Sequence, residues 1–318
     1  MILIEDIDKI RKPYINGVVS IGNFDGMHLG HRALFGDVIK KAKSIGGTSI
    51  AMTFEPHPIK LLKSSGYPSI ITISEQKFEL MADTGIDVLI CIPFTKQFAS
   101  ISARQFVEDI LVKRMGMKVI VIGKDYSFGK NREGNLEFLQ KCSNKLGFEV
   151  IVIDWVYLSS GMSERISSTK IRELVTSGHI TKAKEMLGRN YQIRGTVVKG
   201  RNRGGELLGF PTANINLDDE LCPKTGVYAV TVEYQNEKFC GVANIGYSPT
   251  FDDHVYTVEA HILDFNSDLY GKKIRVNFVK RIRDEIKFES IEKLAEQISN
   301  DVKTARNVLA LETNCDHS

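Results

Sequence analysis

Two histidines close to the start of the chain are the first side chains suited to chemistry. His28 and His31 stand three residues apart, after an apolar run at 18–21 and a turn at 22–26 that reads GNFDG. This order predicts a strand, a tight turn and a helix start, where unpaired backbone N–H groups and the helix dipole favour anions. Two imidazoles at helical spacing would face the same anion. Solvated turn histidines are the alternative, and the clustering of two of the chain's seven histidines in four residues makes it the weaker one.

A second cluster combines hydroxyl groups with positive charge. Residues 166–172 read ISSTKIR, so three hydroxyl groups, a lysine and an arginine fall at the start of a predicted helix. Hydroxyl groups, helix N–H groups and a guanidinium together suit a polyphosphate. Taken alone, the cluster fits better an ordinary N-cap serine followed by solvated charges.

A third candidate is the basic, glycine-rich stretch at 195–214, which reads GTVVKGRNRGGELLGFPTAN. Its glycines would let the backbone approach phosphates, although a flexible basic hairpin is the alternative. It is no Walker A loop, because Glu206-Leu207 stands where Lys-Ser/Thr is needed. Thr212 and Asn214 lie two apart on a predicted strand and so point to the same face. Their oxygen atoms suit Mg²⁺ held together with ATP phosphates.

A glutamate inside an apolar run is the last candidate. Glu259 lies in the sequence YTVEAHIL at 256–263, and glutamate is a poor strand former. This position therefore suggests a functional role, and an ordinary outward-facing strand residue is the alternative. His261 shares the face of Glu259, and we interpret it as structural.

The first half of the chain must position these residues on an α/β scaffold. Apolar runs at 18–21, 48–54, 88–94, 119–123 and 149–156 alternate with helical patterns at 32–45, 74–82, 102–115 and 135–146. The alternation predicts a parallel sheet covered on both faces, with ligands beyond the carboxyl ends of the strands. The histidine turn at 22–31 and the loops at 53–58 and 123–129 would then share one edge of the sheet. Ser102 and Gln105 have the spacing of a capping box.

The second half changes to short strands without helices between them. Candidate strands lie at 191–199, 212–216, 226–234, 238–243, 255–263 and 272–280, which favours a closed antiparallel barrel. A final helix, capped by Ser290, should lay an apolar stripe on the barrel. The stripe consists of Ile291, Leu294, Ile298, Val302 and Val308. We expect domains at 1–187 and 188–312 and a tail at 313–318.

Composition is typical of a two-domain globular protein of 318 residues. The net charge of +3 is too small to indicate nucleic acid as a partner. No apolar run is long enough for a membrane span, and the start MILIEDIDKI is acidic where a signal peptide is basic. Five scattered cysteines indicate neither a disulfide framework nor a zinc site. We therefore expect a cytoplasmic protein with neither nucleic acid nor membrane as partner.

The two clusters of the first half, GxFDGxHxGH and ISSTxxR, together resemble the HxGH nucleotidyltransferase superfamily. The KMSKS loop of class I aminoacyl-tRNA synthetases, which share HxGH, is not found in the chain. The stretches TFEPHP and GKDYSFGKNREG, and GxPTAN and VEAH in the second half, are similar to those of one family, the prokaryotic bifunctional riboflavin kinase/FAD synthetases. The resemblance implies a Rossmann-like nucleotidyltransferase domain followed by a β-barrel riboflavin kinase domain with a C-terminal helix.

The resemblance also implies what each residue does. In the first domain ATP would contact Gly22, Asn23, Phe24, Asp25, His28, His31, Ser168, Thr169 and Arg172, with both histidines catalytic. The flavin there would lie near Phe54, Pro56, Asp125 and Phe128, whereas His57 is interpreted as structural. In the second domain Glu259 would be the catalytic base, and Thr212 and Asn214 would hold the metal. ATP would contact Gly200, Arg203, Gly205, Pro211 and Thr212, and the flavin Arg281, Arg283 and Glu285.

The implied function is flavin cofactor synthesis. The second domain would phosphorylate riboflavin to FMN, and the first would adenylylate FMN to FAD with release of pyrophosphate, each with ATP and Mg²⁺. One alternative is a single-activity nucleotidyltransferase whose second domain only binds flavin or regulates. Another is a flavin or nucleotide sensor with inactive sites, against which the presence of His28, Arg172, Asn214 and Glu259 argues.

Overall fold

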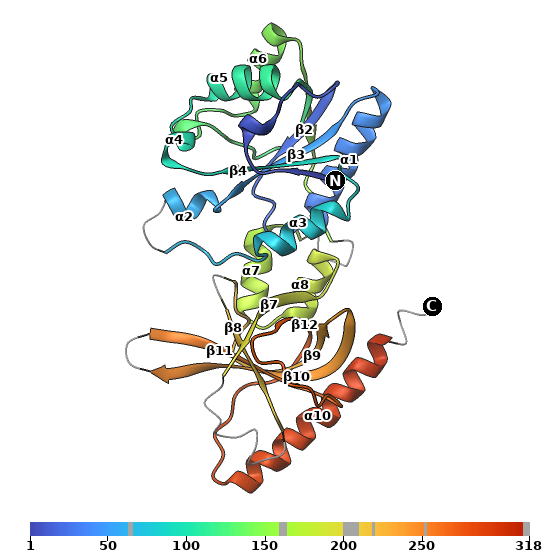
Figure 1. Cartoon of the computed structure of the whole chain (residues 1–318), viewed down its shortest axis with the longest axis vertical. Coiled ribbons are helices and arrows are strands. Elements are labelled where there is room, and N and C mark those ends of the chain that lie inside the picture. The colour runs from blue at the N-terminus through green and yellow to red at the C-terminus, as the bar shows by residue number, and fades with distance from the viewer. Residues whose placement is uncertain (63–65, 159–163, 200–209, 218–219, 251–252, 314–318) are drawn as a thin grey trace. The chain divides into compact units, whose positions relative to one another are not determined.

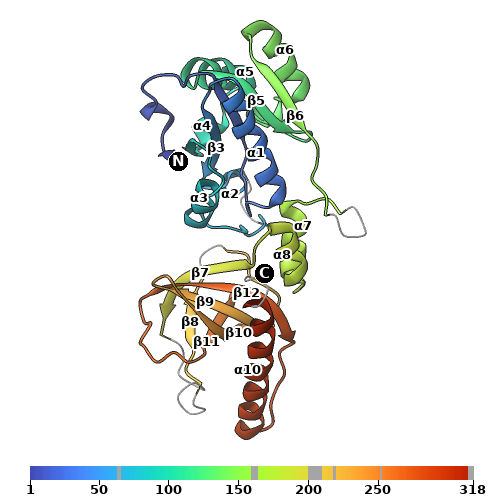
Figure 2. The same ribbon diagram turned by 90° about the vertical axis from the view of Figure 1, so that its right-hand side faces the viewer.

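A computed structural model describes residues 1–62, 66–158, 164–199, 210–217, 220–250 and 253–313 (Figures 1 and 2). Contacts within the chain divide it into two units. The first comprises Met1–Pro68 and Ile73–Ser167, and the second Ser69–Thr72 and Ser168–Ser318. We call them the sheet unit and the barrel unit and describe each by itself. Helices α7 (Ser168–Thr176) and α8 (Ile180–Leu187) are grouped with the barrel by these contacts. The domain boundary expected at 187/188 stays a prediction.

The sheet unit contains a six-stranded parallel sheet in the order β1-β4-β3-β2-β5-β6, which confirms the predicted class. Its strands are β1 (Ile2–Ile4), β2 (Gly17–Ile21), β3 (Ser49–Glu55), β4 (Val88–Pro93), β5 (Met117–Gly123) and β6 (Glu149–Ile153). The edge strand β1 was not predicted. It has three residues, two of them exposed, and is too short to show a pattern.

Helices cover both faces of this sheet, as predicted. They are α1 (Leu29–Ser44), α2 (Pro58–Leu62), α3 (Ser74–Ala82), α4 (Lys96–Ala99), α5 (Ala103–Gln105), the π-helix η2 (Phe106–Arg114) and α6 (Leu136–Leu146), with 3₁₀ turns η1 (Ile7–Lys9) and η3 (Lys130–Arg132). Apolar residues of α1 and α3 form one core with the sheet, and those of η2 and α6 form the other. Ser102 Oγ accepts the Gln105 N–H at 3.2 Å, so Ser102 caps α5 as expected.

The barrel unit is a closed antiparallel barrel in the order β10-β11-β8-β7-β12-β9, also as predicted. Its strands are β7 (Tyr191–Val198), β8 (Ala213–Asn216), β9 (Gly226–Tyr234), β10 (Glu237–Thr250), β11 (Asp253–Ile262) and β12 (Lys273–Arg283). Three large rings fill the interior, since Tyr191, Tyr228 and Phe278 are fully buried and the two tyrosine rings both contact Phe278. Polar side chains of these strands must therefore use the outer face.

Helix α10 (Ile291–Thr313) lies along the outside of the barrel (Figure 2). Its residues Ala305 and Leu309 pack against Val227, Ala229 and Val242, with Val302 and Val308 at the margin. Ser290 caps the helix through the Lys293 N–H, as predicted. Ile291 does not belong to the apolar stripe, because the side chain precedes the covered part of the helix and is 62% exposed. The expected tail lies outside the described residues apart from Thr313, which ends α10.

No helix among the described residues is both long enough and apolar enough to span a lipid bilayer.

We expect Leu309→Ala to lower the free energy of unfolding of the barrel unit by about 2–5 kcal/mol, because truncation leaves a cavity under α10. Lys303→Ala on the exposed side of the same helix should change it by less than about 0.5 kcal/mol. Chemical denaturation followed by far-UV circular dichroism measures both variants. Equal midpoints for Leu309→Ala and the parent would contradict the packing described above.

Candidate active sites

The predicted strand, turn and helix around the two histidines are confirmed. Strand β2 ends at Ile21, and α1 begins at Leu29 with His28 as its N-cap. The Nδ1 atom of His28 accepts the His31 N–H at 3.3 Å, and the two imidazole rings stack with centroids 3.7 Å apart. A Cβ atom at Gly30 would lie 3.1 Å from the His28 ring, so a side chain there would press on it. The helix begins three residues earlier than its pattern indicated, which places His31 in the first turn.

The turn before the histidines is tightly held. Phe24 and Met27 are buried and have positive φ angles of 49° and 39°, which side chains adopt only under constraint. The Phe24 ring meets the His31 ring edge-on at 5.4 Å. The Thr53 hydroxyl donates to the Asn23 carbonyl at 3.3 Å and joins the end of β3 to the turn. Asp25 is 5% exposed, so it belongs to the interior of the turn.

Aromatic rings connect the two loops that the resemblance assigns to flavin. Phe54 at the end of β3 contacts Phe98, Phe98 contacts Phe106, and Phe106 contacts Phe128, with centroids 5.6–6.1 Å apart. The structure therefore brings Phe54 and Phe128 to one aromatic cluster. Sequence reasoning missed Phe98 and Phe106, which stand in a helical stretch and look like core residues there.

The other two proposed flavin contacts lie at the ends of strands. Pro56 directly follows β3 and is exposed. The Asp125 carboxylate follows β5 and pairs with the Arg165 guanidinium at 2.5 Å. That guanidinium also stacks over the ring of Trp155, the chain's single tryptophan, at 4.3 Å. Neither Arg165 nor Trp155 was singled out from the sequence.

A buried lysine was also missed. The side chain of Lys77 on α3 is only 5% exposed, and its ammonium lies 3.8 Å from the Glu55 carboxylate at the end of β3. The Ser74 hydroxyl donates to the same carboxylate oxygen. Glu55 stands between Phe54 and Pro56, so these contacts fix the strand end that carries both proposed flavin residues. A lysine in a helical pattern gives no sequence signal that distinguishes a buried charge from a solvated one.

The ISSTKIR cluster extends across the start of α7: Ile166 and Ser167 precede the helix, and the residues from Ser168 onward belong to the helix and to the barrel unit. Ser168 is the first residue of the helix and Thr169 is exposed, as expected for a helix start. The Arg172 Nε atom donates to the Ser69 carbonyl at 2.9 Å, which holds the guanidinium in place. Their action on the same phosphates as His28 and His31 stays a prediction.

In the barrel unit, strand register places three polar side chains in one row. Glu259 on β11 pairs directly with Asn214 on β8 and with Asn244 on β10. Paired residues of neighbouring strands project to the same face, so these three side chains form a continuous polar row. Burial raises the pKa of the Glu259 carboxyl above its ordinary value of 4.5. A carboxylate with raised proton affinity beside amide groups suits a general base.

The segment before β8 is fixed by His261. The ring Nδ1 atom of His261 donates to the Pro211 carbonyl at 2.8 Å, and the Phe210 ring meets the imidazole edge-on at 5.3 Å. His261 is thus structural, as interpreted from the sequence. Thr212 follows Pro211 directly and precedes Asn214 by two residues. Gly200, Arg203 and Gly205 lie outside the described residues.

The donors near this row fit Mg²⁺. Thr212 offers a hydroxyl oxygen and Asn214 an amide oxygen, and the Glu259 carboxylate is the register partner of Asn214. Hard oxygen donors of this kind, with phosphate oxygens, complete the coordination that Mg²⁺ prefers. Within the residues that the structure describes, no group of three or more His, Cys, Asp or Glu side chains could hold a metal by itself.

The charged residues after β12 have partners within the chain. The Arg281 guanidinium donates to the Thr225 carbonyl and to the Asp284 carboxylate, both at 2.6 Å. Hydrogen bonds from Arg281 and Lys224 lower the pKa of Asp284 to about 2. Arg283 pairs with Asp301 of α10. Glu285 is exposed and comes close to Gly246 on β10.

Both halves of the chain match known protein families. The sequence pattern of the FAD synthetase family matches residues 11–170, and that of the riboflavin kinase family matches residues 187–309. A bifunctional riboflavin kinase/FMN adenylyltransferase of Buchnera aphidicola from Schizaphis graminum is 37% identical over 98% of this chain and 100% of its own length. The chain belongs to this bifunctional family.

Other members cover the chain almost as completely. The riboflavin kinase/FMN adenylyltransferase of Escherichia coli K12 is 37% identical over 98% of this chain and 99% of its own length. That of Listeria monocytogenes is 39% identical over 93% of both. A crystal structure that bears the name of a macrolide-efflux protein from Streptococcus pneumoniae superposes with a TM-score of 0.85 at 35% identity, covering 96% of this chain and 98% of that one. Because the superposition covers almost the whole of both chains, that structure shares the fold of the sheet unit and of the barrel unit.

We expect Glu55→Gln to lower the free energy of unfolding of the sheet unit by at least about 1 kcal/mol, because the Lys77 ammonium would stay buried without a counter-charge. Denaturation followed by the fluorescence of Trp155, which lies in the same unit, measures the change. Adding Lys77→Met should recover part of the loss, as a double-mutant cycle would show. Glu137→Gln breaks an exposed pair with Lys141 and should leave the denaturation midpoint at the parent value, because solvent screens this pair. A Glu55→Gln variant as stable as the parent would contradict the ion pair.

Proposed function

We propose that each unit carries out one of two consecutive steps. The barrel unit phosphorylates riboflavin to FMN, and the sheet unit adenylylates FMN to FAD. The chain is thus a bifunctional riboflavin kinase and FMN adenylyltransferase, in agreement with its family. The observation that supports the proposal best is the half-buried Glu259 carboxylate between Asn214 and Asn244.

In the kinase reaction Glu259 accepts the proton of the ribityl 5′-hydroxyl while the oxygen of that hydroxyl attacks the γ-phosphorus of ATP. The bond from that phosphorus to its bridging oxygen breaks, and ADP leaves. Thr212 and Asn214 would hold Mg²⁺, and the ion would supply positive charge that offsets the charge of the phosphates. Pro211, with Gly200, Arg203 and Gly205, contributes to ATP binding, and Arg281, Arg283 and Glu285 lie beside the flavin. His261 keeps Pro211 and Thr212 against β11.

In the adenylyltransferase reaction an FMN phosphate oxygen attacks the α-phosphorus of ATP, and pyrophosphate leaves. Little covalent work falls to the protein, so positioning and preorganised charge carry the catalysis. His28 and His31 stabilise negative charge on the phosphate oxygens at the start of α1, within the turn formed by Gly22, Asn23, Phe24 and Asp25. Ser168, Thr169 and Arg172 bind the departing pyrophosphate, and Mg²⁺ accompanies the nucleotide. Phe54, Pro56, Asp125 and Phe128 surround the flavin.

We place the enzyme in the cytoplasm, where riboflavin, FMN and ATP are its partners, with no nucleic acid and no membrane. A single-activity transferase with a binding-only barrel is less well supported, since the barrel carries both the proposed base and the proposed metal ligands.

Separation of flavins over time tests the assignment. Purified protein with riboflavin, ATP and Mg²⁺ should form FMN first and FAD afterwards. Glu259→Gln should abolish FMN formation and leave conversion of added FMN to FAD unchanged, whereas His28→Ala should do the reverse. Loss of both activities in a folded single variant would refute two separate sites, and an unmodified chain that makes no FMN would refute the kinase assignment.

The raised pKa of Glu259 gives a second test. The base acts when deprotonated, so kcat/KM of the kinase should fall as the pH drops through a value above 4.5. Burial makes the ionised carboxylate less favourable in the folded state than in the unfolded chain. This destabilisation is absent below the pKa of the unfolded chain, where the group is protonated in both states, and it is complete above the pKa of the folded state. Glu259→Gln should therefore raise the melting temperature at pH 8 and change it less at pH 4. The acidic limb of the rate profile at or below pH 4.5, or a Gln variant less stable at pH 8, would contradict this assignment.

A further inference from the structure

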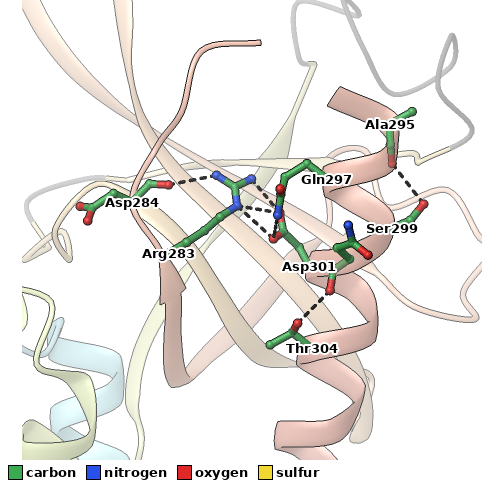
Figure 3. Close-up of polar contacts among 8 residues, drawn as sticks. Arg283, Asp284, Ala295, Gln297, Ser299, Asp301 and Thr304 are labelled. Carbon is green, nitrogen blue, oxygen red and sulfur yellow. Dashed lines mark hydrogen bonds and ion pairs between the residues drawn. The ribbon is translucent and has the colours of Figure 1, made fainter. Parts of the chain in front are cut away.

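The Arg283–Asp301 pair joins the end of β12 to the middle of α10 (Figure 3). The Nε atom of Arg283 donates to both carboxylate oxygens of Asp301 at 3.0 Å, and its Nη2 atom donates to Oδ2 at 2.7 Å. Gln297, one helical turn earlier, donates to Asp301 Oδ1 at 2.9 Å. Asp301 is 3% exposed, which is rare for an aspartate and requires these partners.

The Arg283 guanidinium is therefore committed within the chain. Its remaining nitrogen, Nη1, donates to the Asp284 carbonyl at 2.9 Å, and the group lies over the Phe288 ring at 5.9 Å. Every nitrogen of the guanidinium has an acceptor among the described residues, and its charge faces a buried carboxylate. Because each of its nitrogen atoms already has an acceptor, Arg283 influences a ligand by positioning neighbouring residues.

The neighbouring residues fix the same segment from its other side. Asp284 accepts from Arg281 at 2.6 Å and pairs with Lys224 at 3.2 Å. Arg281 donates in turn to the Thr225 carbonyl, just before β9. The backbone at 283–284 is thus held by α10 on one side and by the start of β9 on the other.

The next residue, Glu285, comes to the polar row of the kinase site. A Cβ atom at Gly246 would lie 2.7 Å from Glu285 Oε1, 3.5 Å from Thr257 Oγ1 and 3.6 Å from Asn244 Nδ2. Gly246 pairs with Thr257, two residues along each strand from the Asn244–Glu259 pair. The Glu285 carboxylate therefore lies over the strands that carry the proposed catalytic base, and the absence of a side chain at Gly246 admits it.

We infer that Arg283 and Asp301 are positioning residues of the kinase reaction, and that they hold the Glu285 carboxylate over Gly246 as an acceptor for substrate hydroxyl groups. The inference rests on the kinase activity proposed above. The hydroxylated chain of riboflavin offers the donors, and a carboxylate accepts them with charge-assisted hydrogen bonds. Alignment of the attacking hydroxyl then depends on an ion pair that does not touch the substrate.

Steady-state kinetics of the full-length protein tests the inference. Asp301→Asn keeps the shape of the side chain and removes its charge, and it should raise KM for riboflavin and lower kcat, reducing kcat/KM by about 10- to 100-fold. Conversion of FMN to FAD by the same preparation should stay unchanged. Gly246→Ala displaces the flexible end of Glu285 and leaves the ion pair intact, so it should reproduce the rise in KM at an unchanged melting temperature.

A matched control is available on the same helix. Arg306 on α10 pairs with Asp264 at 2.9 Å in an exposed ion pair, so Arg306→Gln should leave both kinase constants at their parent values. A purely structural role would make Asp301→Asn lose activity only in proportion to unfolded protein, with KM unchanged. That result, or a Gly246→Ala variant with parent KM, would overturn the inference. Absence of kinase activity in the unmodified protein would instead refute the proposed function.

Discussion

The pairing register of β11 is the constraint on which the kinase site depends. Because β11 pairs with β8 on one edge and with β10 on the other, Glu259 has an amide side chain directly opposite it on each side. The barrel interior is filled by Tyr191, Tyr228 and Phe278, so the polar row has to use the outer face. A slip of one residue would turn Glu259 inward against these rings.

The same register explains why Glu259 is half-buried rather than solvated. Asn244 pairs with Val227 on β9, and Val227 packs beneath α10 together with Val242, two residues before Asn244 on β10. The polar row therefore begins where the apolar surface under α10 ends. Glu259 belongs to this row, and its partial removal from water raises the pKa of its carboxyl.

In the sheet unit, the direction of the parallel strands brings the candidate residues together. Parallel strands bring their carboxyl ends to one edge, which is why Gly22, Phe54 and Asp125, at or just beyond the ends of three different strands, belong to the same edge. At this edge a helix start supplies N–H groups and two stacked imidazoles. The site thus combines a fixed local turn with loops from distant parts of the sequence.

The sequence alone predicted the features that depend on local patterns. Apolar runs located most strands of the sheet and barrel within a few residues, although β10 continues from the predicted end at 243 to Thr250. Motif spacing identified both clusters of candidate residues. Long-range partners were not predictable, because a charged residue looks the same whether it is solvated or paired. Lys77, Arg165 and Asp301 were missed for this reason, and Arg283 was assigned to flavin without its buried partner. The short strand β1 was missed because three residues carry no period.

The ion pairs of the chain fall into two physical classes. Pairs such as Lys141–Glu137 link exposed side chains one helical turn apart, where solvent screens the attraction and the contribution to stability is small. Lys77–Glu55 and Arg283–Asp301 each contain one member that is at least 95% buried. Removing a charge from water is costly, and well-packed apolar residues in place of a buried pair are often as stable or more so.

Stability alone therefore does not account for the two buried pairs. Each of them stands where a strand ends and the chain continues toward a proposed site, since Glu55 is the last residue of β3 and Arg283 the last of β12. Apolar side chains can pack in several similar arrangements, whereas hydrogen-bonded opposite charges have a narrow choice of geometry. Both pairs consequently restrict the direction in which the chain leaves the strand, and that direction sets where Pro56 and Glu285 lie.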